Sequence, residues 1–138
     1  MSSIAMSSFL RRVLLADAVV SAGAGLVMLL GADLLPAWLG LPTALLAAAG
    51  ALLLPYAALL LWLARRPQVP RTAIWFAVVC NVMWAADCLF VAAGGSLGGS
   101  FAPTPLGQAF IGVQVLSVLV FAELQFMALR RERRVAMA

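Results

Sequence analysis

The sequence contains no histidine and no lysine, and only two of its 138 residues are cysteine. Without histidine there is no histidine-ligated haem or metal site and no Ser-His-Asp triad, so we expect no cofactor. Cys80 and Cys88 share one apolar stretch, and on a helix they would lie about 12 Å apart, too far for a disulfide. These absences do not exclude an enzyme, but a lipid-modifying enzyme that pairs Asp17 with Glu123 for acid–base chemistry ranks last among the functions considered.

Charge is also scarce. Charged residues make up 10% of the chain and hydrophobic residues 65%, whereas a soluble domain is nearer one quarter charged and one half apolar. So few charges would not keep a folded chain of this kind in water. Intrinsic disorder is excluded as well, because disorder requires the opposite composition. The composition therefore predicts a membrane protein.

Four apolar segments are long enough to cross a bilayer, which takes about 20 residues of helix. They cover residues 10–31, 43–64, 72–94 and 106–129. Each crossing should be helical, because the bilayer core offers no water to backbone polar groups. Between the first two, residues 33–41 should form a short segment in the outer interface. We expect an all-α fold, with residues 1–138 forming one bundle of four transmembrane helices.

The arginines flank these segments and lie on one side of the predicted membrane. They occupy positions 11–12, 65–66, 71, 130–131 and 133–134. The outer loops, residues 32–42 and 95–105, contain none. Because arginine and lysine mark cytoplasmic loops, both termini should be cytoplasmic, and the use of arginine alone in an Ala- and Leu-rich chain suggests a bacterial inner membrane. This distribution argues for membrane lipids, rather than nucleic acid, as partners of the basic residues.

The connections predict how the helices pack. The short connection at residues 65–71 should make the second and third spans antiparallel neighbours. Small residues at 21–25 and 47–50 should let two helix backbones approach closely. The Gly/Ser-rich segment 94–105 is expected to be the most mobile part of the chain.

Polar residues in the third and fourth spans suggest a ligand site. Asp87, Trp84 and Asn81 follow each other at steps of three along one helix, and Gln114 lies at a similar depth in the next. A carboxylate beside an indole ring and two carboxamides suits a small organic cation. Two other interpretations remain open: a packed polar cluster that joins the two helices, or a carboxyl group close to the outer water.

A second group of polar residues lies nearer the arginines. Asp17, Glu123 and Tyr56 all fall about 8 to 13 Å from the inner side. A buried carboxylate can bind and release protons, so these residues are candidates for a proton-linked role, with Tyr56 donating a hydrogen bond to either acid. The alternative is structural, with Arg12 or Arg130 neutralising the nearby acid.

The layout resembles that of the small multidrug resistance exporters: four helices, an acid in the first (Asp17) and a tryptophan in the third (Trp84). That family's glycine-rich pattern in the third helix is absent, because residues 81–87 read Asn-Val-Met-Trp-Ala-Ala-Asp. The one-sided arginines also oppose an antiparallel dimer of identical chains. The sequence alone therefore assigns the chain to no family.

The sequence thus predicts a small multi-pass membrane protein that binds or transports a small cationic or amphiphilic molecule. One bundle of four helices encloses little space, so transport would require a parallel homodimer. The alternative is a non-catalytic accessory subunit that binds and stabilises a larger membrane complex. In that case the buried polar residues would hold the helices together.

Overall fold

The computed structural model describes residues 2–95 and 101–138. Its elements in chain order are β1 (Ser3–Ala5), α1 (Ser8–Leu30), α2 (Leu35–Leu39), α3 (Thr43–Ala64), β2 (Gln68–Pro70), α4 (Arg71–Ala92) and α5 (Pro105–Met137). Four of the helices, α1, α3, α4 and α5, are long and apolar enough to cross a membrane. The predicted all-α fold with four such helices is confirmed, whereas the side on which the termini lie stays a prediction.

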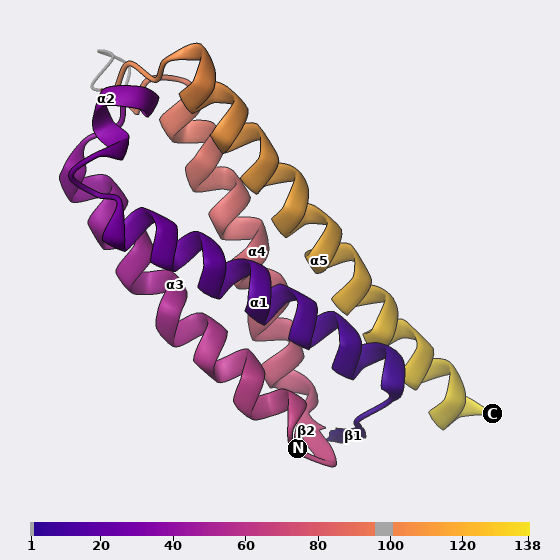
Figure 1. The fold of residues 1–138 in the computed structure, drawn as a ribbon. Helices are drawn as coiled ribbons and strands as arrows, with labels where there is room; N and C mark the ends of the chain where they lie inside the picture. The colour runs from indigo at the N-terminus through magenta and orange to yellow at the C-terminus, as the bar shows by residue number, and fades with distance from the viewer. Residues whose placement is uncertain (1, 96–100) are drawn as a thin grey trace.

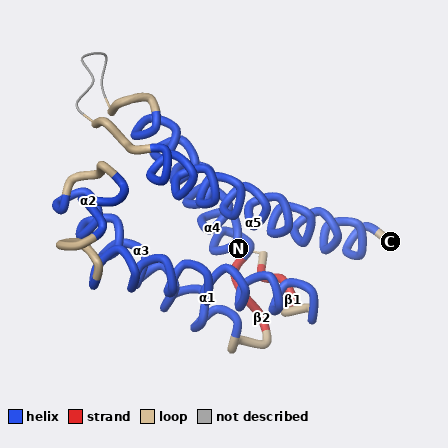
Figure 2. Tube along the Cα trace, turned by 45° about the horizontal axis from the view of Figure 1, so that its top comes forward, coloured by secondary structure: helices blue, strands red, loops and turns tan. Residues whose placement is uncertain are grey.

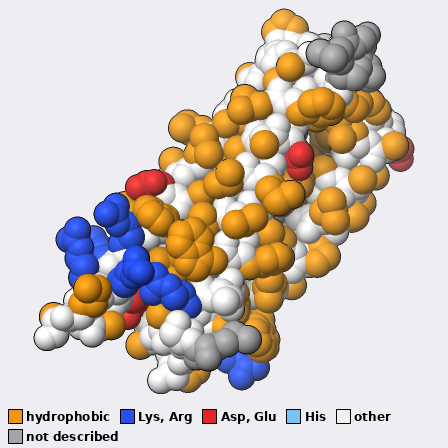
Figure 3. Space-filling model, turned by 180° about the vertical axis from the view of Figure 1, so that it is seen from behind, with side chains coloured by type: hydrophobic (Ala, Val, Ile, Leu, Met, Phe, Trp, Pro, Cys, Tyr) orange, Lys and Arg blue, Asp and Glu red, His pale blue; other side chains and the backbone are white. Residues whose placement is uncertain are grey.

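The long helices form two antiparallel pairs, α1 with α3 and α4 with α5. The pairs make two layers that approach each other along α1 and α5 (Figures 1 and 2). Both termini lie at the same end of the bundle, opposite α2 (Figure 1). On the face shown in Figure 3, the arginine side chains gather towards the end with the termini, and apolar side chains are spread along the rest of the bundle. We call this the basic end, and the end that carries α2 the loop end.

Local signals explain where the helices begin. The side chain of Ser7 accepts from the backbone N–H of Leu10, and that of Thr104 accepts from Gly107, so both act as N-caps. α4 follows Pro70 directly, and α5 begins at Pro105, where the missing N–H costs nothing. α5 continues eight residues beyond the expected end at 129, because its Arg-rich extension consists mostly of good helix formers and contains no glycine or proline.

Glycines set the contact between α1 and α3. A Cβ on Gly25 would lie 3.1 Å from the carbonyl oxygen of Gly50, and one on Gly50 would lie 2.7 Å from that of Gly25. The two backbones therefore approach as closely as the small residues at 21–25 and 47–50 suggested. At Gly50, where backbone atoms of α1 lie this close, a side chain requires the two helices to move apart.

The expected pairing of α3 with α4 is wrong over most of their length. Their buried residues share a core cluster only near the short connection, where Leu60 and Leu63 of α3 pack with Ile74 and Ala77 of α4. Towards the loop end, α4 contributes partly buried side chains such as Trp84 to the cluster that contains Leu53 of α3. There the two helices separate, and α3 packs on α1 instead. The close contact of Gly25 with Gly50 favours the α1 pairing more strongly than the short connection favours α4.

The basic end is closed by a small sheet that the sequence analysis did not anticipate. β1 pairs antiparallel with β2, with Ile4 opposite Val69. Both side chains are buried and belong to the core cluster at that end. The N-terminal residues are thereby attached to the α3–α4 connection.

At the loop end, α2 occupies the segment 33–41 that was expected to form a short interfacial element. It ends at Gly40, whose φ of 68° favours glycine. Thr104 donates from Oγ1 to the carbonyl of Trp38 over 2.6 Å, so α2 is fixed to the start of α5. Residues 96–100, part of the segment expected to be most mobile, lie outside the described residues.

A buried carboxylate and the cleft between α3 and α4

Asp17 lies in the middle of the bundle with a side chain that is 1% exposed. Its Oδ1 accepts a hydrogen bond from Ser21, one turn along α1, at 3.1 Å. Its Oδ2 accepts three more: from the Tyr56 hydroxyl at 3.0 Å, from Asn81 Nδ2 at 3.0 Å, and from Gln125 Nε2 at 2.7 Å. One carboxylate thus connects all four long helices.

The amides around Asp17 also bond each other, because Asn81 Nδ2 donates to Gln125 Oε1 at 3.2 Å. Across the described residues, no buried side-chain nitrogen or oxygen is left without a hydrogen-bond partner. This matters in a membrane, because the bilayer core contains no water that could form a hydrogen bond with an unpaired polar group. We call Asp17, Ser21, Tyr56, Asn81 and Gln125 the Asp17 network.

The hydrogen-bond partners of Asp17 are all uncharged. Arg12, considered as a neutralising partner from the sequence, is exposed at the basic end and is not among them. Four donors converge on two acceptor oxygens, which is the arrangement that a carboxylate accommodates. The network therefore satisfies the carboxyl group of Asp17 with hydrogen bonds from uncharged side chains instead of with an ion pair.

The separation of α3 from α4 leaves a cleft with two cavities. The central cavity, of about 410 Å³, has a mostly apolar lining with polar side chains from Ser21, Tyr56 and Asn81. The loop-end cavity, of about 330 Å³, lies between α3, α4 and the first turns of α5. Trp84 and Asp87 line both cavities, so they stand where the two meet. Volumes of this size suit a small molecule.

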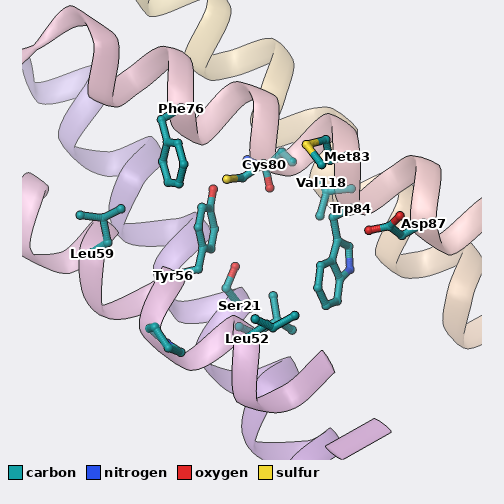
Figure 4. A pocket seen from close by; sticks show the side chains of 13 residues that line it. Ser21, Leu52, Tyr56, Leu59, Phe76, Cys80, Met83, Trp84, Asp87 and Val118 are labelled. Atoms are coloured by element: carbon teal, nitrogen blue, oxygen red, sulfur yellow. The ribbon is translucent and has the colours of Figure 1, made fainter. Parts of the chain in front are cut away.

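Figure 4 shows how the side chains of the central cavity are arranged. Ser21 and Tyr56 lie across from Cys80 on α4, and the indole of Trp84 extends into the space between the helices. Asp87 lies beyond Trp84, further along α4. Its side chain is exposed. The cleft thus has a polar inner wall formed by members of the Asp17 network and a single carboxylate at its outer part.

Trp84 is held in place by the fourth long helix. Its Nε1 donates to Oε1 of Gln114 at 2.9 Å, and Gln114 Nε2 contacts the sulfur of Met28 at 3.9 Å. The indole is therefore tied to α5 and, through Gln114, to α1. A ring fixed in this way presents one face to the cleft instead of changing rotamer freely.

The residues predicted from the sequence fall in different places. Asp87, Trp84 and Asn81 line the central cavity, and Gln114 lines the loop-end cavity. Tyr56 donates to Asp17, one of the two acids that it was expected to contact. The other acid, Glu123, is exposed on α5 and lines neither described cavity. The structure also joins Asn81 to Asp17, which the sequence analysis had placed in separate groups.

The sequence analysis missed Gln125, which is fully buried and makes the shortest bond to Asp17. A signal for it existed. Gln125 lies eleven residues after Gln114, and eleven residues are close to three helical turns, so the two amides share a face of α5. Glu123, two residues away, points to a different side of the helix.

The chemistry available in this cleft is recognition of a polar or charged group within an apolar space. Among residues 2–95 and 101–138, no group of three or more His, Cys, Asp or Glu side chains is placed to hold a metal ion. What the cleft offers is one exposed carboxylate, one fixed indole and a hydrogen-bonding wall. Comparison of the chain with protein-family models, with curated proteins and with solved structures gives no match.

Proposed function

We propose that this protein binds a small cationic amphiphile from within the membrane, in the cleft between α3 and α4. The observation that carries the proposal is the position of Asp87 and Trp84 at the junction of two apolar cavities. A carboxylate on a membrane-spanning helix is costly unless something compensates its charge, so a ligand cation is a natural counter-ion. The indole face adds a second attraction for the same cation.

The remaining lining suits the apolar part of such a ligand. Leu52, Leu59 and Phe76 face the central cavity, and Leu45, Phe90 and Phe110 face the loop-end cavity. A chain or ring system placed here gains by leaving water, and its charged head stays beside Asp87. We therefore propose that Asp87 and Trp84 bind the cation. Asn81 positions the polar wall, and Gln114 positions the indole.

We propose further that the protein lies in a bacterial inner membrane with both termini in the cytoplasm. The clustering of the arginines at the basic end, together with both termini, supports this orientation (Figure 3). Transport would add a second step, in which a parallel homodimer moves the bound ligand and Asp17 carries a linked proton. The contact of Asp17 with all four long helices supports that assignment over the exposed Glu123.

Binding is tested with octylamine, a small cationic amphiphile, titrated by calorimetry into the protein in nanodiscs, with empty nanodiscs as the baseline. We expect saturable binding to the wild type and at least tenfold weaker binding to Asp87→Asn, because the counter-ion is lost. The matched control is Glu123→Gln, which removes an exposed acid outside both cavities and should bind like the wild type.

Two results would overturn the proposal: no saturable signal above empty nanodiscs, or equal binding to the wild type and Asp87→Asn. Either would favour the accessory-subunit interpretation, in which the Asp17 network serves only to hold the helices together. Circular dichroism of each variant separates loss of the site from loss of the fold.

A further inference from the structure

Resting on the proposed function, the hydrogen bonds of the central cavity indicate which chemical class of amphiphile it takes. The polar wall of this cavity consists of Ser21, Tyr56 and Asn81, with Trp84 and Asp87 towards the loop end. What such a wall recognises depends on which of its protons are already engaged in the protein. The structure gives a partner for each of them.

The protons of the two hydroxyl groups point away from the cavity. Ser21 donates to Oδ1 of Asp17, and Tyr56 donates to Oδ2. Each hydroxyl has one proton and two lone pairs, so once the proton is donated only acceptor capacity remains. Towards a ligand, Ser21 and Tyr56 are therefore hydrogen-bond acceptors.

The nitrogen donors of the wall are engaged as well. Asn81 Nδ2 has two protons and makes two bonds, one to Asp17 and one to Gln125. The single proton of Trp84 Nε1 goes to Gln114. Asp87, as a carboxylate, only accepts. Of the polar groups that line the central cavity, the weakly donating Cys80 thiol alone keeps its proton uncommitted in the described structure.

We infer that the central cavity selects a protonated amine that carries a second hydrogen-bond donor, such as an amphiphilic amino alcohol. The ammonium group donates to Asp87, and a hydroxyl group donates its one proton to the oxygen of Tyr56 or to that of Ser21. Tyr56 and Asn81 bond the same oxygen of Asp17, and Asn81 lies six residues before Asp87 on α4, a rise of about 9 Å, which the flexible chain of an eight-carbon amino alcohol can span. A head that only accepts hydrogen bonds, such as a carboxylate or a sulfate, finds no strong donor here and faces Asp87.

The cation itself is also specified by this arrangement. A primary ammonium has three protons to donate, whereas a quaternary ammonium has the same charge and none. Both interact with the indole face through their charge. The carboxylate of Asp87 distinguishes them, because only the primary ammonium makes a charge-assisted hydrogen bond.

The test compares four probes of the same chain length in nanodiscs by calorimetry: octylamine, ω-aminooctanol, octyltrimethylammonium and octanoate. We expect ω-aminooctanol to bind about fivefold more tightly than octylamine, which corresponds to one added hydrogen bond. Octyltrimethylammonium should bind about tenfold more weakly than octylamine, and octanoate should show no saturable binding.

Ser21→Ala identifies the wall as the source of the preference. It removes one acceptor of the cavity and leaves the three bonds to Oδ2 of Asp17 in place. We expect this variant to bind octylamine like the wild type but to lose about half or more of the advantage of ω-aminooctanol. The control is Ser117→Ala, whose hydroxyl donates to the carbonyl of Val113 on its own helix and lies outside the cavity.

The outcomes separate this inference from the proposed function. If octylamine binds with dependence on Asp87 but ω-aminooctanol binds no better, the second-donor inference is overturned and the proposed function stands. If octanoate binds as well as octylamine, the acceptor character of the cavity is refuted. If no amine binds, both fail together.

Discussion

Asn81 Nδ2 lies 3.0 Å from Oδ2 of Asp17, although 64 positions of the sequence separate the two residues. This bond links the α1–α3 layer to the α4–α5 layer near the middle of the bundle. Gln125 makes a second link to the same oxygen at 2.7 Å. Because both links end on one atom, the carboxylate of Asp17 governs how the two layers are held together.

Replacing Asp17 with asparagine should therefore destabilise the bundle. The variant presents an amide in place of a carboxylate, so the donors from Tyr56, Asn81 and Gln125 compete for a single neutral oxygen or face an N–H group. We expect a loss of about 2 kcal/mol in the free energy of unfolding, within the range for leaving buried hydrogen-bond donors unsatisfied. The measurement is SDS-induced unfolding in mixed micelles, followed by circular dichroism.

The matched control is Asp33→Asn, which changes an exposed acid in the turn after α1 in the same chemical way. It should unfold at the wild-type SDS fraction. Equal stability of Asp17→Asn and the wild type would contradict a role for this carboxylate in joining the layers.

The four long helices could be predicted from the sequence, because the length and apolar composition of a segment can be read without knowing how the helices pack. The depth of the polar residues was also accessible, since helical rise converts sequence position into distance. Asp17 and Tyr56 were predicted to lie at similar depths from the inner side, and in the structure a hydrogen bond joins them. Asn81, which was grouped with Trp84 and Asp87 and not with Asp17, nevertheless donates to the same carboxylate at 3.0 Å.

Two features were not accessible in the same way. The pairing of the helices depends on how closely their surfaces fit. The close contact between Gly25 and Gly50 pairs α1 with α3, although the short connection joins α3 to α4. The second feature that could not be predicted in this way was the side of its helix that each polar residue faces. Glu123 was selected for its charge and Gln125 was not considered, although residues two apart on a helix face different sides. Since membrane helices are apolar on nearly every face, hydrophobic periodicity gives little help with that choice.

Gly50→Ala should separate α1 from α3. The added Cβ would lie 2.7 Å from the carbonyl oxygen of Gly25 and 2.8 Å from the backbone nitrogen of Leu29, and backbone atoms cannot rotate aside as a side chain can. We expect a destabilisation of about 2 kcal/mol, typical of overpacking a tight contact. SDS unfolding again provides the measurement.

Gly112→Ala is the control for that substitution, because a Cβ there has nothing within 4 Å. In a helix, alanine is favoured over glycine by up to about 1 kcal/mol, so this variant should be as stable as the wild type or slightly more so. If Gly50→Ala behaves like Gly112→Ala, the two helices do not approach as closely as described.

Thr104→Val should loosen the loop end without unfolding the bundle. The Thr104 hydroxyl accepts from the backbone of Gly107 and donates to the carbonyl of Trp38, so it both caps α5 and retains α2. Valine preserves the shape and removes both bonds, at a cost of about 1 kcal/mol. Hydrogen exchange in detergent should show faster exchange in residues 35–39 and 105–108, with the rest unchanged. Ser117→Ala should leave both segments as in the wild type, and unchanged exchange in Thr104→Val would rule out a role of the Thr104 hydroxyl in retaining α2.

The orientation of the chain is tested by labelling. In a background of Cys80→Ala and Cys88→Ala, single cysteines are placed at two exposed positions, Ala37→Cys in α2 and Ala136→Cys near the C-terminus. Because all nine arginines flank the basic end, the loop end should be the translocated one. A membrane-impermeant maleimide added to intact bacterial cells should label position 37, and position 136 only after permeabilisation. Labelling of position 136 in intact cells would reverse the orientation and place the carboxylate of Asp87 towards the cytoplasmic side, so that a ligand would enter the cleft from there.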